Sequence, residues 1–172
     1  TMALKLLIDP TNGNILGAQA VGPDGVDKRI DVIATAMRAG LRATDLIDLE
    51  LAYAPPFGSA KDPINQLGYI AENRLSGLSA AVDWSEVDAL VAAGWTLLDV
   101  RGEDEFADGS IPGAVNIPLD ELRTQLHRIH GQRVVVYCRV GQRAHVAARL
   151  LAENGVDVRN LDGGWLTWRD AH

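Results

Sequence analysis

The chain has 172 residues, of which 47% are hydrophobic and 23% charged, proportions typical of a globular protein. Its formal net charge of -7 argues against a nucleic-acid or anionic-membrane partner, because such partners require a basic surface. No apolar run approaches the ~20 residues of a membrane span, and no secretory signal is evident, so we predict a cytoplasmic protein with no membrane partner.

The first segment is predicted to begin as a β-hairpin and to continue as a helix. Two apolar runs, at residues 4–8 and 15–21, flank a turn rich in Pro, Asn and Gly. Asp27 is a candidate cap for a helix over residues 28–39, which ends before a glycine. Thr44 is a candidate cap for the short turn that follows.

A proline-rich loop at residues 53–62 separates this hairpin and helix from a second predicted helix. Asp62 and Pro63 are the cap and first-turn signals of that helix, which extends to Leu75. The small residues from 77 to 83 favour no regular element, and we place the domain boundary there. The chain is therefore divided into a first domain, residues 1–77, and a second domain, residues 78–172.

The second domain alternates short apolar runs with helical patterns. This alternation is typical of an α/β domain, in which helices connect the parallel strands of one sheet. Strands are predicted at residues 95–100, 114–117, 134–137 and 158–161, and helices at 85–93, 103–106, 119–129 and 143–154.

Cys138, the only cysteine, lies where a predicted strand passes through a tight loop into a predicted helix. Loop N–H groups, the positive end of the helix dipole, Arg139 and Arg143 all favour a thiolate there. A lone cysteine at a strand end is, without that context, more often a buried core residue. In this context we predict a nucleophile. Since there is no second cysteine, redox or persulfide chemistry at Cys138 requires a second molecule.

Other polar residues of the second domain favour structural interpretations. Asp99 and Arg101 are expected to form a salt bridge that pins a strand to its loop, and Glu105 is expected to be structural or solvated. For His145, on the helix after the cysteine loop, a solvated position is favoured. No His, Asp and Glu residues have the spacing of metal ligands, so no metal is predicted.

Five motifs of the second domain appear in a characteristic order. They are Leu-Leu-Asp-Val-Arg (97–101), Glu-Phe (105–106), Gly-Ser-Ile-Pro-Gly-Ala-Val-Asn-Ile-Pro (109–118), Cys-Arg-Val-Gly-Gln-Arg (138–143) and Leu-Asp-Gly-Gly-Trp-Leu-Thr-Trp (161–168). Together they resemble a single-domain rhodanese over residues 83–172. The resemblance implies an α/β fold around a parallel sheet and a sulfurtransferase that carries sulfane sulfur as a Cys138 persulfide. A small sulfane-sulfur donor would load it and a thiol acceptor would unload it.

The cysteine loop also carries the residues expected to bind the sulfur. Arg143 would orient the loop and stabilise anionic sulfur, while Arg139 would attract an anionic donor. Cysteine-dependent phosphatases, which resemble rhodaneses in fold, use a loop one residue longer, so phosphatase activity is disfavoured. Ser110 and Ala144 depart from the common rhodanese pattern and put donor preference and rate in question. The predicted binding residues are Arg139, Val140, Gly141, Gln142 and Arg143.

Motifs of the first domain point to a different family. They are Leu-Lys-Leu-Leu-Ile (4–8), Gly-Ala-Gln-Ala-Val-Gly (17–22), the run from Gly25 to Ala34, Leu-Ala-Tyr-Ala-Pro-Pro-Phe (51–57) and Ala-Lys-Asp-Pro (60–63). They resemble the α+β dimerisation domain of flavoprotein disulfide reductases of the coenzyme A-disulfide reductase type. The match looks partial, because that domain usually has further strand sequence upstream. Members of this family with a C-terminal rhodanese exist, so the chain resembles the C-terminal part of a CoA-disulfide or CoA-persulfide reductase.

This second resemblance implies a homodimer in which Tyr53 contacts a CoA thiol or disulfide across the interface. A rigid interface residue in a proline-bound loop is the alternative for Tyr53. The full-length family uses FAD, NAD(P)H and CoA, but the sequence has no Gly-x-Gly-x-x-Gly fingerprint, so no cofactor is expected in this chain and alone it cannot pass electrons. The alternative function is a non-catalytic dimerisation and partner-docking fragment.

Overall fold

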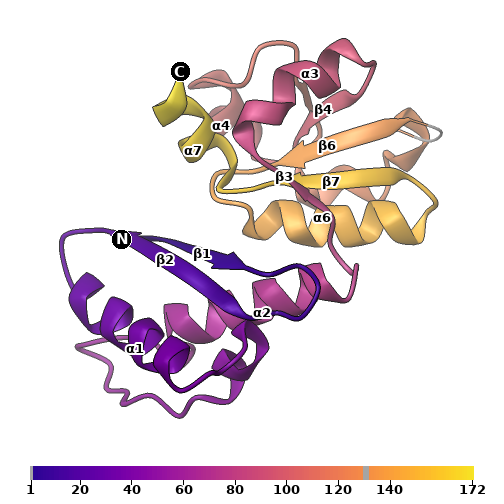
Figure 1. Cartoon of the computed structure of the whole chain (residues 1–172). Coiled ribbons are helices and arrows are strands. Elements are labelled where there is room, and N and C mark those ends of the chain that lie inside the picture. Colours follow the sequence, from indigo (N-terminus) through magenta and orange to yellow (C-terminus); the bar gives the residue numbers. More distant parts are fainter. Residues whose placement is uncertain (1, 130–131) are drawn as a thin grey trace. The chain divides into compact units, whose positions relative to one another are not determined.

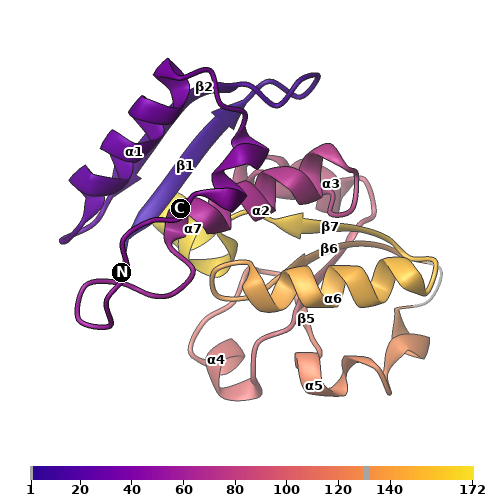
Figure 2. The same ribbon diagram turned by 90° about the horizontal axis from the view of Figure 1, so that it is seen from below.

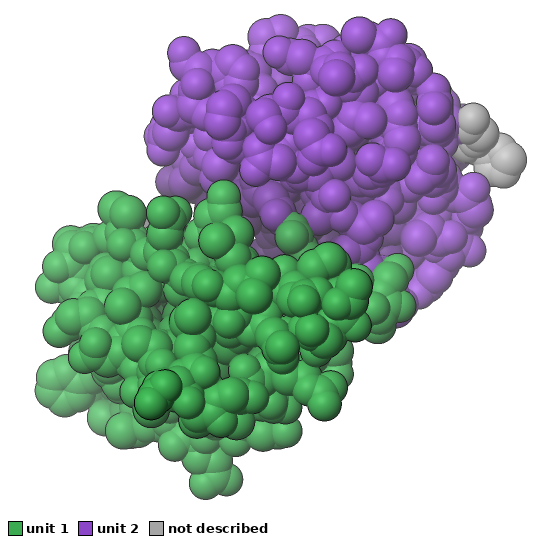
Figure 3. All heavy atoms as spheres, in the orientation of Figure 1, with its two compact units in different colours: residues 1–77 green, residues 78–172 purple. Residues whose placement is uncertain are grey.

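The computed structural model describes residues 2–129 and 132–172, and the chain divides into two compact units, residues 1–77 and 78–172 (Figure 3). Each unit has its own buried hydrophobic residues. Among the described residues, one cluster belongs to the first unit and two clusters belong to the second. Each unit is therefore described by itself.

The first unit is a β-hairpin with helices. Strands β1 (Ala3–Ile8) and β2 (Ile15–Val21) are antiparallel, and α1 (Val26–Arg38), a 3-10 helix η1 (Ala43–Asp48) and α2 (Pro63–Leu75) follow. Their apolar side chains share one core, which includes Ile15, Ile33, Leu46 and Ile64.

Capping in the first unit confirms one expectation and corrects two. Asp62 caps α2 as predicted, because its carboxylate accepts a hydrogen bond of 3.0 Å from the backbone N–H of Ile64. Helix α1 starts before Asp27: its N-cap is Gly25, whose φ of 67° suits glycine. The N-cap of η1 is Arg42 rather than Thr44, because the Asp45 carboxylate accepts from the Arg42 backbone N–H at 2.7 Å.

The second unit is a parallel five-stranded sheet flanked by helices (Figure 1). The strand order is β3-β7-β6-β4-β5, and the predicted α/β fold with a parallel sheet is confirmed. The strands are β3 (Ala81–Val82), β4 (Thr96–Asp99), β5 (Val115–Asn116), β6 (Arg133–Tyr137) and β7 (Asp157–Leu161). The helices are η2 (Trp84–Glu86), α3 (Val87–Ala92), α4 (Glu103–Ala107), α5 (Leu119–Leu122), η3 (Leu126–Arg128), α6 (Gln142–Glu153) and α7 (Gly164–Ala171).

Alternation along the central strands gives the sheet two buried faces. Val134 and Val136 of β6 belong to the cluster that includes the α6 residues Ala147 and Leu151. Val135 and Tyr137 of the same strand belong to the other cluster, with residues of α3 and α7. Figures 1 and 2 show α6 along one face of the sheet, with α3 and α7 on the other. Because both faces of the sheet are covered, residues 134–137 of β6 form a continuous apolar run.

Two expectations for the second unit are corrected by the structure. The single helix predicted over residues 119–129 is two short helices, α5 and η3, because the Glu121 carbonyl accepts from both the N–H and the hydroxyl of Thr124 and the chain tightens there. The stretch 77–83 contains a strand, β3, that pairs with β7. The strand was not predicted because two residues are too few to show the period-two alternation that identifies a strand in a sequence.

No helix in residues 2–129 or 132–172 is long and apolar enough to cross a membrane.

Candidate active site

Cys138 is placed by the topology of the sheet. The strands β6 and β4 are neighbours in the sheet. After β4 the chain continues to β5 on one side of this pair, and after β6 it continues to β7 on the other side, so the two connections run in opposite directions. In open parallel sheets, ligands bind at the carboxyl ends of the strands beside such a divergence. Cys138 follows β6 directly at this point, and its residue exposure is 1%.

The loop after Cys138 is tied down through its carbonyl groups. The carbonyl oxygen of Cys138 accepts from the N–H of Trp165 at 2.8 Å, and that of Arg139 accepts from the N–H of Leu166 at 3.1 Å. Both donors belong to the first turn of α7, whose N–H groups have no partner within their own helix. Helix α7 therefore fixes the orientation of the two peptide groups that follow the cysteine.

This orientation makes the loop a set of hydrogen-bond donors. In a trans peptide the N–H points opposite to the C=O, and no peptide among the described residues is cis. The N–H groups of Arg139 and Val140 therefore point away from α7, and no hydrogen bond among the described residues uses either. The N–H of Gly141 donates to the Cys138 sulfur at 3.2 Å. The loop thus offers N–H groups to an anionic sulfur.

Two glycines make this loop possible. Gly141 has a φ of 101°, in the region that side chains rarely adopt, and it is the N-cap of α6. Gly164, with a φ of 59°, lies so close to the cysteine loop that a Cβ would collide with the carbonyl oxygen of Cys138. The Gly-Gly pair of the last motif therefore allows α7 to approach the loop.

Arg143 is held in place by Glu105 of α4. The guanidinium donates to both carboxylate oxygens, Nη1 to Oε2 at 2.6 Å and Nη2 to Oε1 at 2.8 Å. These hydrogen bonds lower the pKa of Glu105 to about 2. The same hydrogen bonds raise the pKa of Arg143, and the negative charge of a Cys138 thiolate raises it further. Glu105, expected to be structural or solvated, forms an ion pair that connects α4 to the first turn of α6.

The predicted salt bridge between Asp99 and Arg101 is confirmed. The two side chains are buried, with Nη2 of Arg101 lying 2.6 Å from Oδ2 of Asp99. Burial lowers the pKa of Arg101, but the hydrogen bonds and charge of Asp99 outweigh that effect, so its pKa is raised. The same guanidinium donates to the carbonyl of Gly109 at 2.7 Å. The pair therefore anchors the segment after α4 to the end of β4.

Two residues near the site have contacts that the sequence did not predict. The side-chain amide of Asn160, at the end of β7, donates to the Gly141 carbonyl at 3.3 Å, and nothing in the motifs distinguishes this asparagine. His145 is half-buried rather than solvated, and its Nδ1 lies 3.2 Å from the Ser79 hydroxyl.

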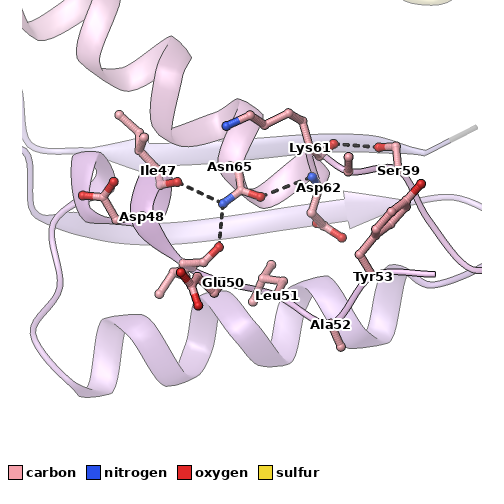
Figure 4. A pocket seen from close by; sticks show the side chains of 12 residues that line it. Ile47, Asp48, Glu50, Leu51, Ala52, Tyr53, Ser59, Lys61, Asp62 and Asn65 are labelled. Atoms are coloured by element: carbon pink, nitrogen blue, oxygen red, sulfur yellow. Dashed lines mark hydrogen bonds between the residues drawn. The ribbon is translucent and has the colours of Figure 1, made fainter. Parts of the chain in front are cut away.

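The predicted residues from 138 to 143 lie in the loop after β6 and in the first turn of α6, whereas Tyr53 belongs to the first unit. Among the loop residues, Arg139, Val140 and Gln142 are exposed. Tyr53 is 54% exposed and lines a pocket of about 320 Å³, together with Lys61, Asp62 and Asn65 (Figure 4).

One wall of this pocket is rigid. The Asn65 amide donates to three backbone carbonyls, those of Leu46, Ile47 and Leu49, at 3.0, 3.2 and 3.0 Å. The Asp62 carboxylate forms a buried ion pair with Arg29 at 2.7 Å. Asp62 is therefore both a helix cap and half of an ion pair, which fixes the end of the proline-rich loop.

Within the described residues, no group of three His, Cys, Asp or Glu side chains could hold a metal ion.

Comparison with known families agrees with this geometry. A rhodanese-like domain is matched over residues 83–171, more than half of the chain, and the chain therefore belongs to the rhodanese-like family. The dimerisation domain of pyridine nucleotide-disulphide oxidoreductases is matched over residues 1–63. Both resemblances predicted from the motifs are confirmed.

Relatives of known identity combine the two domains or share the first. A coenzyme A disulfide reductase of Staphylococcus aureus (strain bovine RF122 / ET3-1) is 49% identical over 69 residues, 40% of this chain and 16% of that protein. The crystal structure of reduced CoADR-RHD from Bacillus anthracis matches with a TM-score of 0.95 and 48% identity. An NAD-dependent persulfide reductase from A. fulgidus matches with a TM-score of 0.87 and 36% identity. Both structural matches cover 97% of this chain and 30% of the other chain, so this chain spans less than a third of each relative.

Proposed function

We propose that this chain is a sulfurtransferase module in which Cys138 carries sulfane sulfur as a persulfide. The observation that carries the proposal is the Cys138 loop itself. A lone thiol lies at the carboxyl end of the central strand, with an N–H donating to its sulfur, two further N–H groups open and a positioned guanidinium nearby. Each of these features stabilises a negatively charged sulfur. Membership of the rhodanese-like family supports the same chemistry.

The reaction has two steps that need no external oxidant or reductant. The Cys138 thiolate attacks the sulfane sulfur of a donor, an S–S bond forms, and the bond between the sulfane sulfur and the rest of the donor breaks. Its electron pair leaves with the donor remnant. A thiol acceptor then attacks the outer sulfur as its thiolate, and the Cys138 thiolate is the leaving group.

The loop residues have separate roles in this proposal. The N–H groups of Arg139, Val140 and Gly141 bind the terminal persulfide sulfur, while Arg143, held by Glu105, supplies a fixed positive charge. Gln142 is exposed in the first turn of α6, where its side chain can contact a donor.

We further propose that the module is the C-terminal part of a CoA-disulfide or CoA-persulfide reductase, with CoA as the thiol acceptor. The match to the dimerisation domain and the two fused relatives support this placement. The first unit would form a homodimer, and Tyr53 would contact CoA. A phenol can donate a hydrogen bond to a thiolate. FAD and NAD(P)H would be bound by other domains, since this sequence lacks the dinucleotide fingerprint.

Steady-state transfer tests the proposed activity. The full chain is given benzenethiosulfonate as donor and CoA as acceptor, and both benzenesulfinate release and CoA persulfide formation are followed. Both products should appear with the native chain and be absent with Cys138→Ser. Equal rates for the two proteins would refute the proposal.

The runner-up function is a non-catalytic dimerisation and docking fragment. It is favoured by the exposed apolar side chains of the hairpin, among them Leu16 and Val21, which are 62% and 75% exposed. This alternative predicts tight self-association in sedimentation experiments. It also predicts that neither benzenesulfinate nor CoA persulfide is formed in the transfer assay.

A further inference from the structure

The Cys138 loop contains two guanidinium groups, but only one of them is free to meet a substrate. Arg139 is exposed and forms no ion pair within the described part of the chain. Arg143 donates from its two terminal nitrogens, Nη1 and Nη2, to the two carboxylate oxygens of Glu105. An arginine held in this bidentate way has its preferred anion-binding edge occupied.

The Glu105 carboxylate also cancels charge at the site. The positive charges of Arg139 and Arg143 are balanced by Glu105 and by the reactive Cys138 thiolate. Arg101, whose positive charge also lowers the pKa of Glu105, is neutralised by the buried Asp99. Glu103 and Asp104 precede Glu105 in the first turn of α4 and add negative charge.

We propose that Glu105 is a specificity-determining residue that selects against dianionic sulfur donors such as thiosulfate. The module would prefer donors in which an organic group carries the sulfane sulfur and at most one negative charge lies beside it. This inference rests on the proposed sulfurtransferase function and concerns only which donor loads Cys138. Since hydrogen bonds from Arg143 hold the pKa of Glu105 at about 2, the carboxylate remains charged at neutral pH.

Thiosulfate and benzenethiosulfonate are suitable probes, because the same bonds change with both. The Cys138 thiolate attacks the outer sulfur, the S–S bond of the donor breaks, and its electron pair leaves on sulfite or on benzenesulfinate. Charge is conserved in both reactions, and no other reactant is consumed. The donors differ in charge by one unit, since thiosulfate is a dianion and benzenethiosulfonate is a monoanion.

The experiment compares the kcat/KM for thiosulfate with that for benzenethiosulfonate in the full chain and in three variants. Glu105→Gln should raise the thiosulfate-to-benzenethiosulfonate ratio by about three- to tenfold, as expected for one charge at close range under partial solvent screening. Glu105→Asp, which keeps the charge, should leave the ratio within about twofold. Glu153→Gln is the matched control, because it removes a carboxylate that contacts Arg149 at the other end of α6. It should leave the ratio unchanged.

A ratio that is the same in Glu105→Gln and in the native chain, with Cys138 loaded by both donors, would overturn the inference and leave the proposed function standing. Absence of persulfide with either donor in the native chain would refute the proposed function, and the inference with it.

If Glu105→Gln does not fold, the dependence of the reaction on salt concentration provides the test. Thiosulfate reactivity of the native chain should not fall between about 20 mM and about 200 mM salt, because the site has no net positive charge to screen. A steep fall would overturn the inference.

Discussion

At the scale of single residues, the chemistry of this site depends on pairs that lie far apart in sequence. Cys138 could be identified from the sequence, because the strand, loop and helix around it are contiguous. The partner of Arg143 could not, because Glu105 lies on α4 and only the fold of the sheet brings the two side chains together. The same is true of Asn160 and Gly141, which meet only once β7 lies beside β6.

The Glu105 ion pair predicts a specific pH dependence of stability. A carboxylate whose pKa is lower in the folded chain stabilises the fold above its unfolded pKa of 4.5 and loses that contribution as the pH falls toward about 2. Because the Glu105 side chain is 36% exposed, the contribution should be no more than about 1 kcal/mol.

This dependence is measured by chemical unfolding of the native chain and of Glu105→Gln. The difference in their free energies of unfolding should be constant above about pH 6 and should shrink as the pH falls below 4.5. A difference that stays the same down to pH 2 would contradict the assigned ion pair.

At the scale of elements, the active loop is supported from two sides. Helix α6 follows it, and the first turn of α7 holds its carbonyls. The sequence predicted α6, because its apolar residues recur at helical spacing. It did not predict that α7 fixes the loop, since backbone hydrogen bonds leave no pattern in side-chain chemistry. The failure at residues 119–129 has a similar cause, because Thr124 donates to the backbone carbonyl of Glu121 where the break after α5 occurs.

Because α7 lies close to the loop, adding one methyl group at Gly164 should destabilise the fold. Gly164→Ala should lower the free energy of unfolding by at least about 2 kcal/mol, because the residue has a positive φ and its Cβ would meet the Cys138 carbonyl. Gly155→Ala is the matched control: it also has a positive φ, but nothing lies within 4 Å of its Cβ. It should cost only about 1 kcal/mol. Equal losses in urea unfolding would show that α7 does not contact the loop closely.

At the scale of the whole molecule, the sequence predicted two families in one chain, and both are found. The role of Tyr53 stays a prediction, because its pocket belongs to the first unit and the proposed contact requires a second subunit. That role depends on an assembly and not on this chain alone, so neither the local motif nor the fold of one chain can establish it.

Because the two units have separate hydrophobic clusters, we predict that the second unit folds on its own. Its two hydrophobic clusters consist only of residues from 82 onward, so residues 78–172 should fold without the first unit. Thermal unfolding of this fragment, followed by circular dichroism, should give one cooperative transition, and the fragment should still load sulfur on Cys138. A fragment without a cooperative transition would show that the first unit is needed for the fold.

The central claim is that Cys138 carries sulfane sulfur, and intact-protein mass spectrometry tests it most directly. After brief treatment with benzenethiosulfonate and removal of the excess, the native chain should gain the mass of one sulfur atom, and peptide mapping should place that sulfur on Cys138. Cyanide or CoA should then remove it. A chain that keeps its original mass, while a rhodanese of known activity is loaded in parallel, would contradict the account.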